Sequence, residues 1–209
     1  MSEPAVDERV LRLAEALFKN TLIKSRFYLA GGTALALQLN HRKSFDIDLF
    51  SYKEFNTIPL TEYIIKQKGM ITYSEQGTIH CSIKKIKVSF LHYPYLLLNP
   101  LIKLHNVKIA SLQDIACMKA VAISQRAEKK DFFDVYQILQ NHTPVEFKNM
   151  FLKKYQKSHI NCYHILRSLF YFDDVENSPE PISSNGTTWR MVKKWFVTHE
   201  KEITKALLC

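Results

Sequence analysis

The sequence has few cysteines, and none of them forms a recognisable pair. The four cysteines of this 209-residue chain lie far apart and make no C-x-x-C motif: Cys81, Cys117, Cys162 and Cys209. This spacing argues against a zinc site and against the disulfide framework of a small secreted protein. We therefore expect reduced thiols.

Long apolar runs and an export signal are also missing from the sequence. The run Leu96-Leu97-Leu98 is ended by Asn99-Pro100, and no other run approaches the length of a membrane span. The first residues, Met1 to Pro4, are acidic and lack the basic-then-apolar order of a signal peptide. We expect a cytoplasmic protein with no membrane partner.

Acidic residues are fewer than basic ones, 20 against 29, which gives a net charge of +9. Such an excess is typical of proteins that bind a polyanion: a nucleotide, a nucleic acid or a membrane surface. A surface that only keeps the protein in solution explains the charge equally well. With 46% hydrophobic and 23% charged residues, the composition is that of an ordinary globular protein with a sizeable core.

The hydrophobic patterning changes character near residue 110 and predicts an α+β fold. We expect a mixed sheet with helices over 1–110, followed by a helical lobe over 111–209, the two forming separate domains or one continuous domain. The predicted strands are 26–29, 46–50, 70–73, 78–83, 86–93 and 107–109. The predicted helices are 6–19, 33–39, 53–68, 111–126, 129–140, 145–156, 160–171 and 188–207, with an irregular loop over 173–186.

Two carboxylates one residue apart form the most informative motif. Asp46 and Asp48 lie in a predicted strand, where alternate side chains share a face, so their Cα atoms would be about 6.5–7 Å apart. Phe45, Ile47 and Leu49 would share the opposite face. Two anions on one half-buried face are costly unless a hard cation such as Mg²⁺ binds them. The motif therefore indicates metal-dependent phosphoryl or nucleotidyl transfer.

A glycine pair precedes these acids, at a predicted change from strand to helix. Gly31 and Gly32 would let backbone N–H groups approach phosphates at the positive end of the helix, and Thr33 would add a hydroxyl donor. The alternative is a tight turn that needs glycine only for its backbone. The two acids downstream favour the phosphate-binding interpretation.

With Lys119 and the run Lys130-Asp131 added, the chain resembles the AbiEii/AbiGii nucleotidyltransferase toxins of type IV toxin–antitoxin systems, within the DNA polymerase β-like nucleotidyltransferase superfamily. The runs that carry the resemblance are Gly31–Ala36, His41–Phe50 and Asp114–Ala120. It implies a polymerase β-like core, with a small mixed sheet flanked by helices, followed by a C-terminal helical lobe. It also implies an enzyme that binds an NTP and Mg²⁺ and transfers a nucleoside monophosphate to an acceptor, with tRNA the leading candidate. A cognate antitoxin is the further implied partner.

The resemblance assigns roles to individual residues. Asp46 and Asp48 would bind the metal, and the nucleotide would contact Gly31, Gly32 and Thr33. Arg42 and Ser44, just ahead of the strand, would contact the triphosphate or order Asp46, and surface positions in a connecting loop explain them equally well. Lys119 would hold the triphosphate, and Asp131 would orient Lys119 or assist the acceptor. An ordinary salt-bridge cluster between helices is the alternative, and we favour it for Asp134, as a partner of Arg126.

Ser89 departs from the superfamily pattern, because a third carboxylate often occupies this position on a later strand. Serine is neither a carboxylate base nor a strong metal ligand. The site either works with two acids, uses another residue, or is impaired. An impaired site would leave a nucleotide- or RNA-binding regulatory module, and a third possibility is an enzyme acting on a protein or small molecule.

Lysines along the chain suggest a path for an RNA backbone, with Tyr155 and Tyr163 stacking on bases. These lysines are Lys84, Lys85, Lys87, Lys148, Lys153, Lys154 and Lys157. Taken individually, each of these lysines more often belongs to an ordinary solvated surface. The acidic loop 173–176 is a candidate contact for the antitoxin or a simple surface loop.

Overall fold

The computed structural model describes residues 4–208. The strands are β1 (Tyr28–Ala30), β2 (Ile47–Ser51), β3 (Met70–Glu75), β4 (Thr78–Ile83), β5 (Ile86–His92), β6 (Ile102–Leu104) and β7 (Val107–Ile109). The helices are α1 (Glu8–Leu17), α2 (Thr21–Arg26), α3 (Gly31–Leu39), α4 (Thr57–Lys66), α5 (Leu112–Arg126), α6 (Lys129–Leu139), α7 (Pro144–Tyr155), α8 (Cys162–Ser168) and α9 (Trp189–Leu208), with a 3₁₀ turn η1 (Asp173–Val175). None of the described helices is long and apolar enough to cross a membrane.

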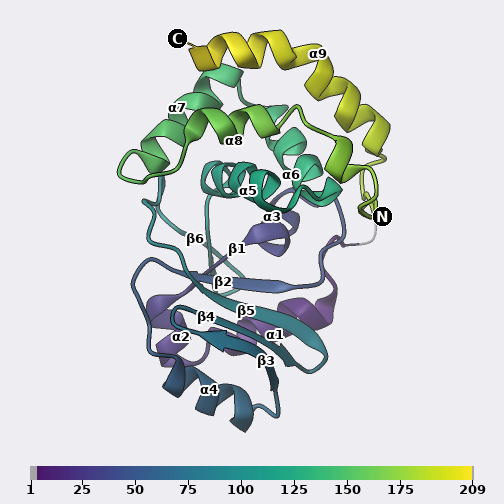
Figure 1. The fold of residues 1–209 in the computed structure, drawn as a ribbon. Helices are drawn as coiled ribbons and strands as arrows, with labels where there is room; N and C mark the ends of the chain where they lie inside the picture. The colour runs from purple at the N-terminus through teal and green to yellow at the C-terminus, as the bar shows by residue number, and fades with distance from the viewer. Residues whose placement is uncertain (1–3, 209) are drawn as a thin grey trace.

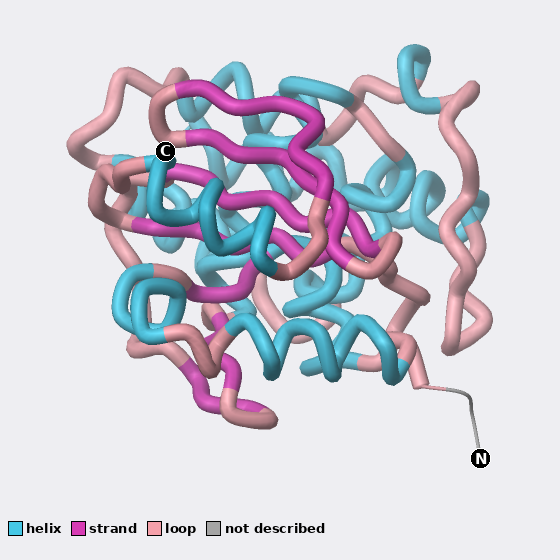
Figure 2. The backbone as a smooth tube through the Cα atoms, turned by 90° about the horizontal axis from the view of Figure 1, so that it is seen from below, coloured by secondary structure: helices cyan, strands magenta, loops and turns pink. Residues whose placement is uncertain are grey.

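The seven strands form one mixed sheet in the order β3-β4-β5-β2-β1-β7-β6. β2 is central and runs parallel to β5 and antiparallel to β1. As Figure 1 shows, α5 to α9 lie together above one face of the sheet, with α3 between them and the strands, while α1, α2 and α4 lie below the other face. Figure 2, seen from below, places the lower helices in front of the strands. The α+β prediction is confirmed.

Side-chain alternation in the central strands decides which face carries chemistry. Ile47 and Leu49 of β2 and Phe90 of β5 are fully buried on the face that packs against the lower helices. Asp48 and Ser89, on the same two strands, point to the opposite face, toward the helical lobe. The sheet therefore holds its polar residues on the side that the C-terminal helices cover.

The helical lobe is joined to the sheet by a continuous apolar core that includes residues from both halves of the chain. Ser111 caps α5, because its hydroxyl accepts a hydrogen bond from the backbone N–H of Asp114 at 3.1 Å. α7 begins with a capping box between Thr143 and Glu146. These caps fix where each helix begins and hence which side chains reach the sheet.

Several predicted boundaries are wrong. The expected helix over 53–68 is shorter, Thr57–Lys66, and α2 and β6 were not predicted from the sequence. Phe45 does not share the buried face of Ile47 and Leu49, because β2 begins only at Ile47 and the Phe45 side chain is exposed. The other predicted strands and helices are present, most of them within one or two residues of their expected ends.

Candidate active site

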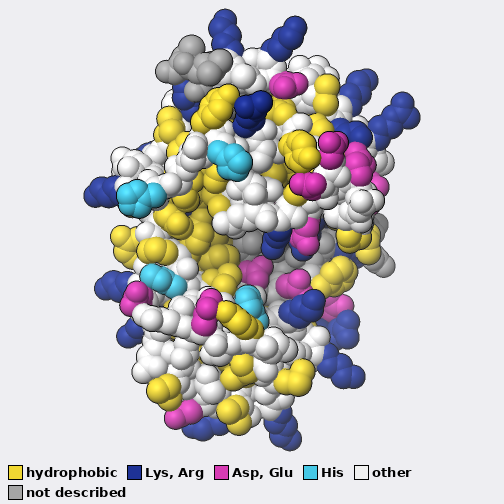
Figure 3. Space-filling model, viewed as in Figure 1, with side chains coloured by type: hydrophobic (Ala, Val, Ile, Leu, Met, Phe, Trp, Pro, Cys, Tyr) yellow, Lys and Arg dark blue, Asp and Glu magenta, His cyan; other side chains and the backbone are white. Residues whose placement is uncertain are grey.

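A cavity of about 480 Å³ lies between the sheet and the helical lobe. Figure 3 shows this hollow at the middle of the molecule, with acidic and basic side chains inside it. Its lining comes from distant parts of the chain: Gly32, Arg42–Asp46, Asp48, Lys87, Ser89, Lys119, Arg126, Lys130 and Pro179–Ile182. Most of the predicted site residues therefore meet at one place.

The two predicted metal-binding acids both line the cavity. Asp46 is exposed just before β2, and Asp48 lies on β2 between Ala30 of β1 and Ser89 of β5. Burial raises the pKa of Asp48, the positive charge of Lys119 opposes that shift, and Asp46 adds to it. Asp48 is therefore a carboxylate that a nearby cation would stabilise in its charged form.

Asp46 and Asp48 are a pair of carboxylates and do not by themselves make a complete set of metal ligands. Among residues 4–208, no three His, Cys, Asp or Glu side chains gather in a group that could hold a metal ion. A pair still fits Mg²⁺, because that ion commonly takes one or two protein carboxylates and completes its shell with water and substrate phosphates. The donor set is thus compatible with Mg²⁺ bound together with a nucleotide.

The glycine pair leaves room for the charged side chains next to it. Gly31 has φ +69°, and a Cβ there would lie 2.7 Å from Oδ2 of Asp48. A Cβ on Gly32 would lie 2.6 Å from Nη2 of Arg42. Each glycine thus lets one charged side chain lie directly against the turn at the start of α3.

Thr33 and Ser44 connect this turn to the segment that carries the acids. The Thr33 hydroxyl lies 2.9 Å from that of Ser44, and it also donates to the backbone carbonyl of Asp46. Both side chains are buried. Among the predicted nucleotide-binding residues, Gly32, Arg42 and Ser44 line the cavity, whereas Gly31 and Thr33 lie behind its wall.

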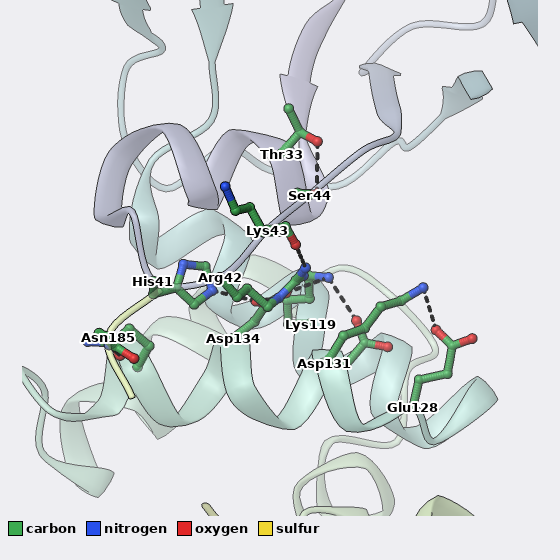
Figure 4. A network of polar contacts seen from close by, with 12 residues as sticks. Thr33, His41, Arg42, Lys43, Ser44, Lys119, Glu128, Asp131, Asp134 and Asn185 are labelled. Carbon is green, nitrogen blue, oxygen red and sulfur yellow. Dashed lines mark hydrogen bonds and ion pairs between the residues drawn. The ribbon is translucent and has the colours of Figure 1, made fainter. Parts of the chain in front are cut away.

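Asp134 is the centre of a buried ion network. Its carboxylate accepts two hydrogen bonds from Arg42, at 2.7 and 2.8 Å, and one from Nε2 of His41 at 2.7 Å. Lys119 reaches the same carboxylate at 2.7 Å. Burial alone would raise the pKa of Asp134, but Arg42 and Lys119 hold it well below its usual range. Figure 4 shows Asp131 and Asp134 projecting from α6 toward Lys119 and Arg42.

Asp131 completes the network one turn earlier on α6. It accepts a hydrogen bond from Lys119 at 2.7 Å and two from Arg126, at 2.8 and 3.0 Å. Burial by itself would lower the pKa of Lys119. The negative charges of Asp131 and Asp134 together have the larger effect and raise that pKa. With Glu128 and Lys130 included, four cations face three carboxylates here, so positive charge remains beside Asp46 and Asp48.

Some predicted contacts are wrong. Asp134 pairs with Arg42 and Lys119, while Arg126 pairs with Asp131 and Glu128. Tyr155 is buried, with its hydroxyl 2.6 Å from that of Tyr93, so it offers no surface for a base.

Lys154 is buried too, and its ammonium group binds Asp114 at 2.6 Å. It cannot belong to a surface path for RNA. The other predicted lysines lie at or near the surface, and Tyr163 is 50% exposed.

Part of the cavity wall was not predicted from the sequence. Phe45, Lys87 and Pro179–Ile182 line it, and the last of these belongs to the irregular loop predicted over 173–186, which was assigned no role in the site from the sequence. Only the position of Phe45 between Ser44 and Asp46 connects it with the site in sequence. The loop is brought there by backbone pairing, in which Lys43 donates to Ile182 at 2.8 Å and Ser184 donates to His41 at 2.9 Å.

Comparison with known protein families and sequences gives two matches. The family model described as nucleotidyl transferase AbiEii toxin, type IV TA system, matches residues 12–98 and 75–196. An uncharacterized protein of Aquifex aeolicus (strain VF5), aq_aa25, is 37% identical over 183 residues, which cover 84% of this chain and 87% of that protein.

Solved structures share the fold at low sequence identity. MenT4, a nucleotidyltransferase toxin of Mycobacterium tuberculosis H37Rv, superposes with a TM-score of 0.54 at 12% identity, over 95% of this chain and 90% of that one. A protein of H. pylori, provisionally described as a nucleotidyltransferase, gives a TM-score of 0.53 at 16% identity, over 95% and 98% of the two chains. At such identities the likeness establishes the fold.

Proposed function

The chain belongs to the AbiEii family of nucleotidyltransferase toxins, and on this premise we propose that it transfers a nucleoside monophosphate from an NTP to tRNA in a Mg²⁺-dependent reaction. In this proposal it is the toxin of a bacterial toxin–antitoxin pair. The family resemblance found in the sequence is thereby confirmed, and with it the assignment as a nucleotidyltransferase. The metal, the acceptor and the role of each residue belong to the proposal.

One observation carries the proposal: Asp46 and Asp48 line the same cavity as Gly32 and a cluster of cations. A triphosphate needs positive charge along its length and a metal at the phosphorus that is attacked. Asp46 and Asp48 would hold Mg²⁺, which when bound would neutralise charge on the phosphates and polarise a phosphoryl oxygen.

The network behind the cavity sets the positions of the cations. Lys119 and Arg126 are fixed by Asp131, and Arg42 is fixed by Asp134. Cations held in this way need no reorganisation when charge develops on the leaving pyrophosphate. Asp131 therefore acts through Lys119 and Arg126, as a positioning residue.

Surface charge supports a polyanionic acceptor. Exposed lysines occupy the β4–β5 hairpin, next to the cavity wall that Lys87 forms: Lys84, Lys85 and Lys87. Lysines on a surface bind phosphates without regard to sequence. We therefore place the RNA backbone along this hairpin.

The test is transfer from labelled NTP to total tRNA in the presence of Mg²⁺. Asp46→Asn and Asp48→Asn should each abolish labelling, while Asp173→Asn, in the exposed turn η1, should label as the wild type does. Circular dichroism and thermal unfolding would establish that the variants are folded. Full labelling by both site variants would refute the metal-binding role.

Ser89 favours a second candidate, a nucleotide- or RNA-binding module without turnover. It predicts NTP binding but no labelled product with any divalent metal. Adding a cell extract and separating RNA from protein distinguishes a third outcome, in which a protein or small molecule carries the label.

A further inference from the structure

Two large apolar side chains are exposed where the cavity opens. Phe45 is 56% exposed and Ile182 is 61% exposed, and both line the cavity. Neither belongs to the hydrophobic core formed by the described residues, and Phe45 makes none of their ring-to-ring contacts. Apolar side chains grouped at the edge of a polar cavity are typical of a ligand-binding surface.

The two side chains are held by segments that pair with each other. The carbonyl of Ile182 accepts the N–H of Lys43, two residues before Phe45, and Arg42 and Ser183 form an antiparallel bridge. Glu180 is fixed as well, because its Oε1 accepts the backbone N–H of Trp189 at 2.6 Å. The apolar wall is therefore tied to the segment that carries the acids.

The position of Phe45 restricts what can bind there. It directly precedes Asp46, one of the two acids proposed to hold the metal at the α-phosphate. In an NTP only the ribose separates the α-phosphate from the base, so the base must lie within one sugar of these acids. The triphosphate would occupy the polar part of the cavity, beside Gly32 and Arg42.

We propose that Phe45 and Ile182 form the two walls of a slot that holds the nucleobase of the NTP. Phe45 stacks on one face of the base, and Ile182 packs against the other. Every base presents a flat π-face, so such a slot contributes affinity with little discrimination between bases. This inference rests on the proposed function and adds to it the recognition of the base.

The test measures equilibrium binding by calorimetry with Mg²⁺, using each of the four NTPs and inorganic tripolyphosphate, which has no base. Phe45→Ala should weaken NTP binding about tenfold, the loss expected for one stacked base, and leave tripolyphosphate binding unchanged. Ile182→Ser should have a smaller effect of the same kind. Phe45→Tyr should bind NTP within about twofold of the wild type, because its ring is retained.

Ile58→Ala is the matched control, since Ile58 is 63% exposed on α4, on the other side of the sheet. It should bind every ligand as the wild type does. Unchanged NTP binding by Phe45→Ala would overturn the slot, as would an equal loss of tripolyphosphate. A higher KM for tRNA with intact NTP binding would assign the surface to the acceptor and also overturn it.

The two proposals fail in different ways. If the wild type binds NTP and Phe45→Ala binds it equally well, the slot is refuted and the proposed transferase function is untouched. If the wild type binds NTP through Phe45 but labels no acceptor, the slot stands and the proposed reaction is refuted. If the wild type binds no NTP, both are refuted.

Discussion

Ser89 lies directly opposite Asp48 across the parallel β2–β5 pair, and its hydroxyl lowers the pKa of the Asp48 carboxylate. The same hydroxyl is 3.1 Å from Nδ1 of His80 on the next strand. A serine thus occupies the position facing the cavity where the superfamily often has a third acid. Burial has the larger effect on the Asp48 carboxylate and raises its pKa.

Replacing this serine by an acid tests whether the position can serve a metal. Without divalent cations, Ser89→Asp should lower the free energy of unfolding by about 1–2 kcal/mol, because two carboxylates would face each other across the strands. Millimolar Mg²⁺ should restore most of that loss, which thermal unfolding with and without the ion would measure. Ser89→Ala, which adds no charge, is the control. A Ser89→Asp variant insensitive to Mg²⁺ would contradict metal binding at this position.

Gly31 and Gly186 offer a matched comparison of backbone strain with crowding. Both have positive φ, +69° and +78°, but a Cβ on Gly31 would meet Asp48, while one on Gly186 has no atom within 4 Å. Gly186→Ala should cost about 1–2 kcal/mol for the left-handed backbone alone. Gly31→Ala should cost a further 1–3 kcal/mol for the overpacked contact. Chemical denaturation measures both, and equal losses would disprove the role of the Asp48 contact.

Asp134→Asn should reduce stability strongly, because Arg42 and Lys119 would lose the charge that compensates them in a buried place. A loss of about 3–5 kcal/mol is expected at pH 7. The folded-state pKa of Asp134 is depressed, so its contribution is present above the unfolded pKa near 4 and is lost as pH falls through the folded value. The wild type should therefore lose stability below about pH 5, and Asp134→Asn should lose less over the same range.

Urea unfolding at several pH values between 3 and 7 would test this behaviour. Asp7→Asn is the control, because the Asp7 carboxylate pairs with Arg9 in an exposed place. The amide oxygen of the asparagine in this variant can still cap α1. It should leave the pH profile close to that of the wild type. Parallel pH profiles for Asp134→Asn and the wild type would contradict the buried network.

Lys154 and Lys153 are neighbours in sequence with different surroundings. Lys154→Met should cost about 3–5 kcal/mol, because Asp114 would remain buried without its partner. Lys153→Met should change stability by less than about 0.5 kcal/mol, since Lys153 is exposed. Chemical denaturation of the two variants is the comparison, and similar stabilities would show that the buried pair contributes little.

Much of the fold was predictable from local patterns. Alternation of apolar residues defines the β4–β5 hairpin, and the change to helical periodicity after residue 110 defines the lobe, because strands and helices bury side chains with different periods. The two acids and the glycine pair were recognisable for the same reason: each motif is short and lies within one or two elements. β6 was overlooked because it is a three-residue strand with little buried surface.

The sequence by itself determined the family, the α+β class and the choice of Asp46 and Asp48 as candidate site residues. All three depend on short-range spacing of residues. Only the tertiary structure decided which charges meet, since His41 and Asp134 are 93 residues apart and Lys154 and Asp114 are 40 apart. It also decided that Phe45 and Ile182 line one cavity, because the loop around Ile182 reaches the site through backbone hydrogen bonds. Every residue except proline carries the same backbone N–H and C=O groups, so that pairing leaves little mark in the amino-acid sequence.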